Sequence, residues 1–265
     1  MTTAQKIIKN LSIAFAIFLI ISLISFIISL VSGISSGFTF NSNYSINENN
    51  NYDAYLGIGL ISSNLKIVKD KELYVENNND DIEVSQNNHK IIIKEKKFKF
   101  KFFNNKEEKN IVVHVPSDIK FDLVNIESGA GKLEIETINT NKLDLKLGAG
   151  TTLIKYLNSD ETNIESGVGS LDIKEGKMND SKLELGIGSI NINTLMTGTN
   201  KIESGIGKLN LKLDNPIEDL KFKFEKGIGR INLNENEVSN DSVVGNGNTY
   251  IEIEGGIGSI NVNTK

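Results

Sequence analysis

The hydrophobic pattern divides the chain into two parts. Residues 11–31 (LSIAFAIFLIISLISFIISLV) are almost uniformly apolar, whereas beyond residue 40 apolar and polar residues alternate, as they do over residues 111–115. Alternation with a period of two is typical of strands that bury one face, and no window beyond residue 40 has the 3.6-residue period of an amphipathic helix. The pattern therefore predicts one N-terminal helix followed by an all-β region.

The apolar stretch is long enough to cross a membrane. No charged side chain occurs from residue 10 to residue 47, and a helix that rises ~1.5 Å per residue needs about 20 residues to span a hydrocarbon core of roughly 30 Å. We therefore predict a transmembrane helix at residues 11–36. A cleavable signal peptide is the alternative, because the serine-rich residues 32–37 leave cleavage open.

Charge gives this span a direction. Lys6 and Lys9 precede it and all 34 acidic residues follow it, so the positive-inside tendency leaves residues 1–10 in the cytoplasm. Residues 37–52 are rich in Asn and Ser and have no period, which is typical of a tether. We expect a single-pass protein of the cell membrane, in which residues 53–265 form an extracytoplasmic β domain.

A Gly-x-Gly motif recurs along this domain. Its first five copies follow one another in steps of 19 residues, and the last two come after steps of 22 and 29 residues. Self-similarity at a fixed short period is the signature of a solenoid. We therefore predict a single-stranded β-solenoid (β-helix) with 19-residue rungs, regular over residues 121–265. Rungs about 4.8 Å apart place the seven motifs along roughly 29 Å of rod. The motif glycines are Gly129, Gly131, Gly148, Gly150, Gly167, Gly169, Gly186, Gly188, Gly205, Gly207, Gly227, Gly229, Gly256 and Gly258.

Local sequence explains the two longer steps. The 22-residue step contains Asp214-Asn215-Pro216, a turn that adds three residues. The 29-residue step contains Gly245-Asn246-Gly247 between β-rich flanks, and Asn-Gly is a hairpin signal. We expect a protruding hairpin of about ten residues at this point.

Apolar residues stand at fixed distances from each motif. Three residues before the first glycine are Ile126, Leu145, Ile164, Leu183, Ile202, Phe224 and Ile253. Between the glycines are Ala130, Ala149, Val168, Ile187, Ile206, Ile228 and Ile257. Six residues after the first glycine are Ile135, Ile154, Ile173, Ile192, Leu211, Leu233 and Val262. We expect all three columns to face inward and the chain to turn a corner at the second glycine, where a positive φ is cheap only for glycine. The first glycine points outward by parity and lets neighbouring rungs approach closely.

The residue before each motif leaves the size of the repeating unit open. It alternates between small and large, in the order Ser128, Leu147, Ser166, Leu185 and Ser204. The alternation indicates either interdigitated packing between 19-residue rungs or a unit of 38 residues, and we favour the first.

Composition excludes several kinds of chemistry. The chain has no cysteine, which rules out disulfides, thiolate zinc sites and cysteine nucleophiles. Only two histidines occur, His89 and His114, and the formal net charge is −5, which argues against nucleic-acid binding. Strands follow the Gly-x-Gly motifs, whereas a dinucleotide-binding fingerprint needs a helix there.

A glutamate stands two residues before the first glycine in six motifs, and Lys146 replaces it in the other. By parity these side chains face outward and form a ladder on a solvated face. A row of Ca²⁺ ligands that includes Glu165, Glu184 and Glu203 is the alternative, but calcium rolls need a nine-residue period and an Asp after the glycines. The six glutamates are Glu127, Glu165, Glu184, Glu203, Glu225 and Glu254.

Two basic stretches carry interleaved aromatic residues, at residues 96–103 (KKFKFKFF) and 221–224 (KFKF). We interpret them as amphipathic strands, with phenylalanines in the core and lysines on an exposed face or edge. Contact with an anionic wall polymer or with lipid head groups is the alternative.

Catalytic motifs are not found. The sequence has neither a Gly-x-Ser-x-Gly elbow nor a His-Glu-x-x-His motif, and His114 lies in an alternating strand beside Pro116, which favours a structural role. Two carboxylates on a β-helix suffice to act on a polysaccharide, but nothing singles out a pair among 34 acidic residues. We expect no enzymatic activity, no cofactor and no metal.

Residues 112–117 (VVHVPS), 125–133 (NIESGAGKL) and 147–150 (LGAG) carry a resemblance to a known family. The chain is similar there to the bacterial “putative adhesin” family of β-strand-repeat proteins, a domain of unknown function, and the likeness extends from Asp53 to the C-terminus. The resemblance implies a right-handed β-solenoid at the outer surface of the cytoplasmic membrane. It brings no catalytic residues.

These observations lead to three hypotheses about function. We favour a membrane-anchored, non-enzymatic surface or interaction module, adhesive as the family label suggests, whose flat sheets bind an envelope protein or an anionic wall polymer. A regulatory or sensing component of the cell-envelope stress response, acting through the single span, is the alternative. A β-helix enzyme that acts on polysaccharide is the third.

Overall fold

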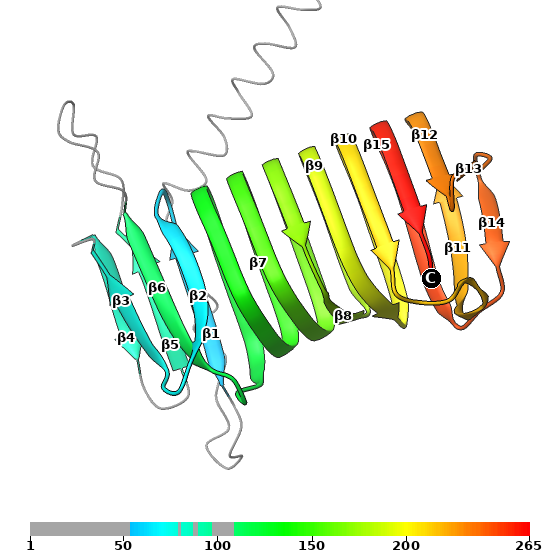
Figure 1. Ribbon diagram of the computed structural model, residues 1–265. Coiled ribbons are helices and arrows are strands. Elements are labelled where there is room, and N and C mark those ends of the chain that lie inside the picture. The colour runs from blue at the N-terminus through cyan, green and yellow to red at the C-terminus, as the bar shows by residue number, and fades with distance from the viewer. Residues whose placement is uncertain (1–53, 79–80, 87–89, 97–108) are drawn as a thin grey trace, which may run out of the picture. The chain divides into compact units, whose positions relative to one another are not determined.

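The computed structural model of the 265-residue chain describes residues 54–78, 81–86, 90–96 and 109–265 (Figure 1). The cytoplasmic segment, transmembrane helix and tether predicted within residues 1–52 lie outside them. In the described part of the chain, no helix has the length and hydropathy that crossing a membrane requires. The described residues are all-β, and their strands join into one 15-stranded sheet that winds into a solenoid.

The strands fall into three groups along the chain (Figure 1). The first group is β1 (Tyr55–Leu60), β2 (Asn64–Asp70), β3 (Tyr74–Asn77), β4 (Ile82–Gln86), β5 (Lys90–Glu95) and β6 (Asn110–Pro116). The second is β7 (Phe121–Ile173), β8 (Gly176–Asn179), β9 (Ser181–Thr197) and β10 (Thr199–Leu213). The third follows a 3-10 turn, η1 (Ile217–Asp219), and is β11 (Leu220–Glu225), β12 (Ile228–Leu233), β13 (Asn236–Glu237), β14 (Ser242–Gly245) and β15 (Thr249–Asn263).

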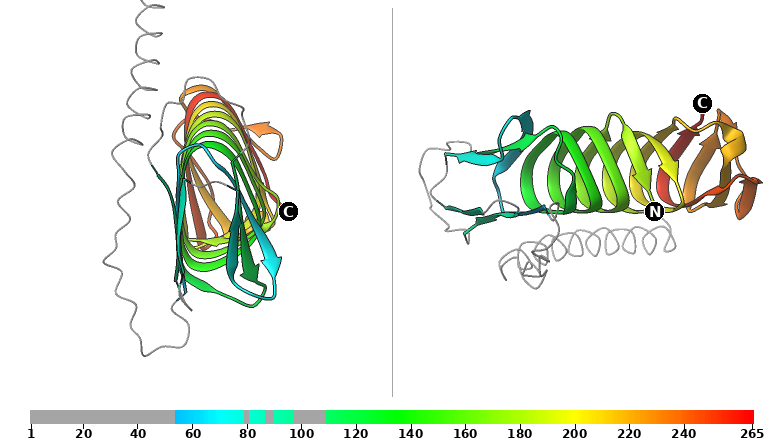
Figure 2. Two further views of the ribbon diagram at one scale, coloured as in Figure 1. Left: turned by 90° about the vertical axis from the view of Figure 1, so that its left-hand side faces the viewer. Right: turned by 90° about the horizontal axis from the view of Figure 1, so that it is seen from below.

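Successive passes of the chain lie parallel and in register. Ile164 pairs with Leu183, and Leu183 pairs with Ile202, at intervals of 19 residues. Ser166 pairs with Leu185, so the small and large residues before the motifs pack in one column. The rung, meaning one turn of the chain around the rod, is therefore 19 residues long, and the rungs superpose when viewed along the rod (Figure 2).

Two of the three apolar columns form the interior, as predicted. The side chains three residues before the first glycine are 0% exposed in all seven motifs, and those six residues after it are at most 8% exposed. Burial of each Ile or Leu side chain contributes about 1.5–3 kcal/mol. A single rung leaves these side chains open to water on both sides, so the rungs stabilise one another only as a stack.

The third column is where the prediction is wrong. The residues between the glycines are exposed, with values of 38% for Ile187, 47% for Ile206 and 75% for Ile228. The alternation of inward and outward side chains changes phase between the first glycine and the middle residue. The middle residue therefore already lies on the outward side of the second strand. The second glycine of every motif has a positive φ, between 133° and 153°, which is the left-handed region that favours glycine.

Close approach of the rungs explains why both motif positions are glycine. A Cβ on Gly188 would lie 1.7 Å from the carbonyl oxygen of Gly169, and a Cβ on Gly186 would lie 2.1 Å from that of Gly167. Real Cβ atoms essentially never come within 3.0 Å of such an atom. The first glycine therefore directs its missing side chain along the stack toward the neighbouring rung, and not outward as parity suggested.

The order of the rungs departs from chain order at the C-terminal end. β15 pairs with β10 on one side and with β11 and β12 on the other, so the last rung of the chain lies between the two rungs that precede it (Figure 1). The expected hairpin is wrong, because β14 pairs antiparallel with β11 and not with β15. The apolar columns are alike in every rung and do not determine which rung stacks on which.

At the N-terminal end, too, the order of the rungs departs from chain order. β1 pairs with β5 and β7, and β2 pairs with β6 and β7, so the rung of β1 and β2 lies inside that of β5 and β6. Antiparallel strands cover the outer edges, β4 and β3 at this end and β14 and β13 at the other. Such covers block pairing with further chains. The right-handed sense of the coil stays a prediction.

Asparagine side chains extend the hydrogen bonding of the sheets. Asn215, in the predicted turn before η1, is 4% exposed, and its side chain accepts a hydrogen bond from the Met196 N–H (2.9 Å) and donates one to the Met196 carbonyl (2.8 Å). On the outer surface an asparagine ladder has Nδ2···Oδ1 distances of 2.8–3.1 Å and follows the stack order Asn191, Asn210, Asn261 and Asn232.

Candidate functional site

The exposed residues between the glycines form a continuous column along one edge of the rod. We call this column the aliphatic ridge. Of the eight large hydrophobic side chains that are exposed among the described residues, five lie on it. In stack order the ridge comprises Ala130, Ala149, Val168, Ile187, Ile206, Ile257 and Ile228.

The side chains of the ridge are exposed to solvent because columns of glycine flank them on both sides. Glycine has no side chain to cover Ile187 or Ile206, and the close contact between rungs forbids any larger residue at these positions. The side chains grow from alanine at the N-terminal rungs to isoleucine at the C-terminal rungs, where exposure rises to 50% for Ile257 and 75% for Ile228. Contiguous exposed apolar surface of this kind marks interaction sites in soluble domains.

The glutamates before the motifs also stack in register, in the order Glu165, Glu184, Glu203, Glu254 and Glu225. Lysines lie among them. Lys201 Nζ is 2.8 Å from a carboxylate oxygen of Glu203 and 2.8 Å from one of Glu254, and these hydrogen bonds raise the pKa of Lys201. Lys182 pairs with Glu184. Within the described ranges, no group of three or more His, Asp or Glu side chains is placed to hold a metal ion, so the calcium alternative gains no support.

Residues 221–224 form most of β11, and the structure supports the amphipathic interpretation. The rings of Phe222 and Phe224 are fully buried and stack with their centroids 5.3 Å apart. Lys223 Nζ lies 2.6 Å from carboxylate oxygens of both Glu225 and Glu252. In the other basic stretch only Lys96 is described, and it pairs with Glu83; residues 97–103 lie outside the described residues.

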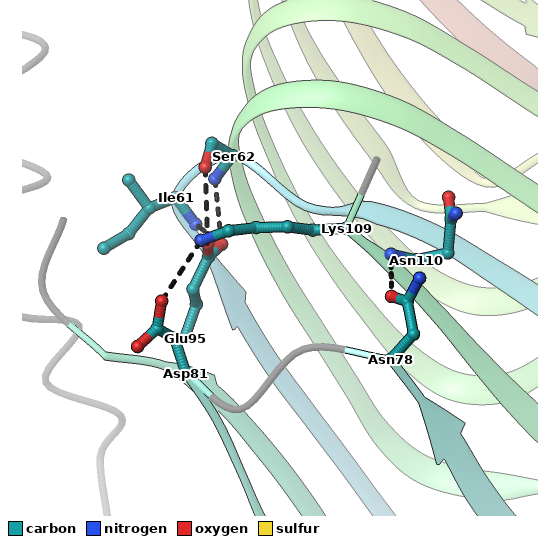
Figure 3. Close-up of polar contacts among 7 residues, drawn as sticks. All are labelled: Ile61, Ser62, Asn78, Asp81, Glu95, Lys109 and Asn110. Carbon is teal, nitrogen blue, oxygen red and sulfur yellow. Dashed lines mark hydrogen bonds and ion pairs between the residues drawn. The ribbon is translucent and has the colours of Figure 1, made fainter. Parts of the chain in front are cut away.

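A buried carboxylate closes the corner between β1 and β2, which has no glycines (Figure 3). Oε2 of Glu95 accepts hydrogen bonds from the backbone N–H of Ile61 (2.8 Å) and of Ser62 (2.9 Å). Its Oε1 lies 3.1 Å from Lys109 Nζ, which also reaches Asp81 at 3.4 Å. The Glu95 side chain is 1% exposed. At the other corners the backbone contacts the backbone of a further rung, whereas at this corner the carboxylate of Glu95, from the outer rung, takes that place.

Burial and hydrogen bonding act in opposite directions on Glu95. Burial alone raises the pKa of its carboxyl group, but the N–H groups of Ser62 and Ile61 and the ammonium group of Lys109 together hold that pKa below its usual value. The group is therefore ionised at neutral pH. With both oxygens engaged by donors, Glu95 is a structural anion and not a free acid or base.

His114 is held in a second polar cluster. Its Nδ1 lies 2.8 Å from Oδ2 of Asp70, and its ring stacks on that of Tyr74 with centroids 4.0 Å apart. The N–H of Lys71, and after it the His114 side chain, hold the pKa of Asp70 below its usual value. These contacts support the structural role predicted for His114. His89 lies outside the described residues.

Sequence reasoning missed the ridge and the cap at Glu95. A signal for the ridge was present: an apolar residue between two glycines has no neighbouring side chains to pack against, which favours exposure. Glu95 had no comparable signal, because its hydrogen bonds reach residues 33 and 34 positions away.

A family model described as Toastrack DUF4097 matches residues 60–247, more than two thirds of the chain. The chain belongs to the Toastrack DUF4097 family. The resemblance to a β-strand-repeat family of unknown function, predicted from the sequence, is confirmed. No protein of curated function matches this Toastrack chain.

Two crystal structures resemble this Toastrack domain. One is described as a putative cell adhesion protein from Clostridium sporogenes; it is 18% identical with a TM-score of 0.32, and the match covers 80% of this chain and 93% of that one. The other is described as a putative adhesin from Bacteroides fragilis; it is 14% identical with a TM-score of 0.42, and the match again covers 80% of this chain and 93% of that one.

Proposed function

We propose that this Toastrack protein is a non-enzymatic interaction module, anchored in the cell membrane by residues 11–36, that binds a protein of the cell envelope through the aliphatic ridge. The single observation that carries the proposal is the ridge itself. It places five large aliphatic side chains, each 38–75% exposed, in one row on a rigid support.

The chemistry of the ridge favours a protein partner over an anionic wall polymer. Isoleucine and valine offer apolar contact but no donor or positive charge to a polyanion. Two lysines of the neighbouring glutamate ladder are already engaged, since Lys201 and Lys223 each contact two glutamates. The adhesin descriptions of the two crystal structures agree with a surface role. We base that role on the exposed side chains of the ridge.

Cross-linking from the ridge tests the proposal in cells. A photoreactive phenylalanine analogue at Ile206 is expected to give one discrete adduct with an envelope protein, and the adduct is expected to disappear when Ile187 and Ile257 are both replaced by Thr. The same analogue at Val243, which is 60% exposed but lies off the ridge on β14, is the matched control. Equal adducts from both positions, or none from Ile206, would contradict the proposal.

The location outside the membrane has its own test. Alkaline phosphatase folds only where disulfides form, so its fusion to Lys265 is expected to be active in intact cells and inactive once residues 11–36 are deleted. An inactive fusion on the intact chain would contradict the proposed location. Deleting residues 41–265 while keeping the anchor then tests the sensing alternative: a changed envelope-stress response on this deletion, with an unchanged response when only Ile187 and Ile257 are replaced by Thr, would favour signalling that does not depend on the ridge.

A further inference from the structure

The outermost rung at the C-terminal end is covered everywhere except at its corner. β14 pairs with residues 221–224 of β11, and β13 pairs with Asn232 and Leu233 of β12. Among the described residues, no strand pairs with the outer side of residues 227–230. All four of these residues are exposed, including Ile228 at the end of the aliphatic ridge.

Hydrogen bonds on either side mark the limits of this open corner. The N–H of Lys226 donates to Oδ1 of Asn240 (2.7 Å), and the carbonyl of Ile231 accepts from the N–H of Val238 (3.0 Å). Between them runs an extended segment whose inner side pairs with β15 in parallel, Ile228 with Ile257 and Gly229 with Gly258. A strand edge left open in this way is a template for one more strand.

The packing between rungs inside the rod indicates which residues that strand must carry. From Gly148 onward, each motif glycine points its missing Cβ at a carbonyl of the neighbouring rung on the N-terminal side of the stack: at 2.2 Å for Gly227 over Gly256, and at 1.8 Å for Gly229 over Gly258. A segment laid on the open corner in the same way meets the carbonyls of Gly227 and Gly229. Any side chain at those two positions collides with the backbone, so the segment has to carry glycine at both.

We propose that residues 227–230 bind an extended Gly-x-Gly segment of another protein, which adds in parallel as one further corner of the stack. The residue between its glycines is aliphatic and extends the ridge beyond Ile228. This inference rests on the proposed function only in that the partner is a protein, and it adds where that partner binds and which sequence it presents.

A second copy of this chain is not the fitting occupant. All seven of its Gly-x-Gly motifs are used inside its own stack. Among the described residues, the opposite end of the stack has its last corner between β1 and β2, which contains no glycine and is closed by Glu95. We therefore assign the open corner to a different polypeptide.

A peptide with the sequence of a natural rung is the direct probe. The purified full-length chain in detergent is titrated with a fluorescent peptide of residues 201–211 (KIESGIGKLNL) and with its double alanine counterpart (KIESAIAKLNL). We expect the glycine peptide to bind at least tenfold more tightly. Ile228→Asp is expected to weaken binding about tenfold, whereas the matched control Val243→Asp, at a similarly exposed site, leaves it unchanged; these fold-changes correspond to ~1.4 kcal/mol.

Three outcomes overturn the inference: equal binding of the two peptides, no effect of Ile228→Asp, or a dimer in light scattering that Ile228→Asp dissolves, which would identify a second copy as the occupant. Unchanged thermal unfolding of both variants shows that the fold is intact. Cross-linking from Ile206 is measured in parallel, so loss of peptide binding with retained cross-linking refutes the corner and leaves the proposed function standing.

Discussion

The two ends of the solenoid share one construction and differ at a single corner. At each end the terminal strands lie one rung inside the stack, and antiparallel strands cover the outermost rung. At the N-terminal end the buried carboxylate of Glu95 takes up the backbone N–H groups of the corner, while at the C-terminal end residues 227–230 are exposed. An edge can thus be closed by one charged side chain or left as a binding surface, without any change in the fold behind it.

The largest effect is expected in the rungs between the two ends, at the glycine corner. Gly188→Ala places a Cβ 1.7 Å from the Gly169 carbonyl oxygen, at a φ of 151°. We expect a loss of more than about 4 kcal/mol in the free energy of unfolding, measured by urea denaturation. Gly255→Ala is the control, because its Cβ has no neighbour closer than 3.4 Å. Similar stability of the two variants would mean that neighbouring rungs can separate at the corner.

The next largest effect is confined to the N-terminal end. Glu95→Gln removes the charge that pairs with Lys109. Because both backbone N–H groups donate to the same oxygen, the amide keeps its oxygen toward them only by turning its NH₂ group toward the Lys109 ammonium group. We expect the free energy of unfolding to fall by about 3 kcal/mol and the amides of Ile61 and Ser62 to exchange faster with solvent. Glu83→Gln is the matched control, since that carboxylate is 64% exposed and pairs with Lys96 at the surface. Unaltered exchange at Ile61 would contradict the capping role.

Acid is expected to weaken the same end. The pKa of Glu95 is lower in the folded chain than in the unfolded one, so its contribution to stability is complete above the unfolded value of about 4.3 and is lost as the pH falls through the lower folded value. Stability measured between pH 6 and pH 3 should therefore fall more steeply for the native chain than for Glu95→Gln. Parallel pH profiles would show that Glu95 has the same pKa in both states.

The smallest effect is expected at the open end. Ile228→Thr alters a side chain that is 75% exposed, so the free energy of unfolding should change by less than about 0.5 kcal/mol. Ile253→Thr, in the fully buried column of the neighbouring rung, is the comparison and should cost more than about 1 kcal/mol. A large loss on Ile228→Thr would mean that the ridge is held by contacts within the chain.

Sequence alone predicts the parts of this fold that repeat. The interval between Ile164, Leu183 and Ile202 gives the length of the rung, and their alternation with polar residues gives the buried face. These features are local, and each is reinforced in every rung. The family resemblance at residues 125–133 rests on the same repeat and was confirmed.

The features that sequence could not supply are those that occur once. β15 has the same apolar columns as any other rung, so nothing in residues 249–263 indicates that they pass between β10 and β12. Glu95 resembles the other acidic residues until its distant partners Ile61 and Ser62 are known. The residues of the aliphatic ridge were predicted to face inward for a different reason: the alternation of inward and outward positions was continued through Val168 and Ile187, one residue too far.

The exchanged rung at the C-terminal end bears on how the molecule is made. Synthesis runs from the N-terminus to the C-terminus, so β15 leaves the ribosome after η1, β11 and β12. Until β15 arrives, β10 and the outermost rung have no partner between them, and the interior stays open to water at that level. The growing chain therefore cannot stack its rungs in the order of synthesis, and the fifteen-residue strand β15 has to insert between two rungs that are made before it.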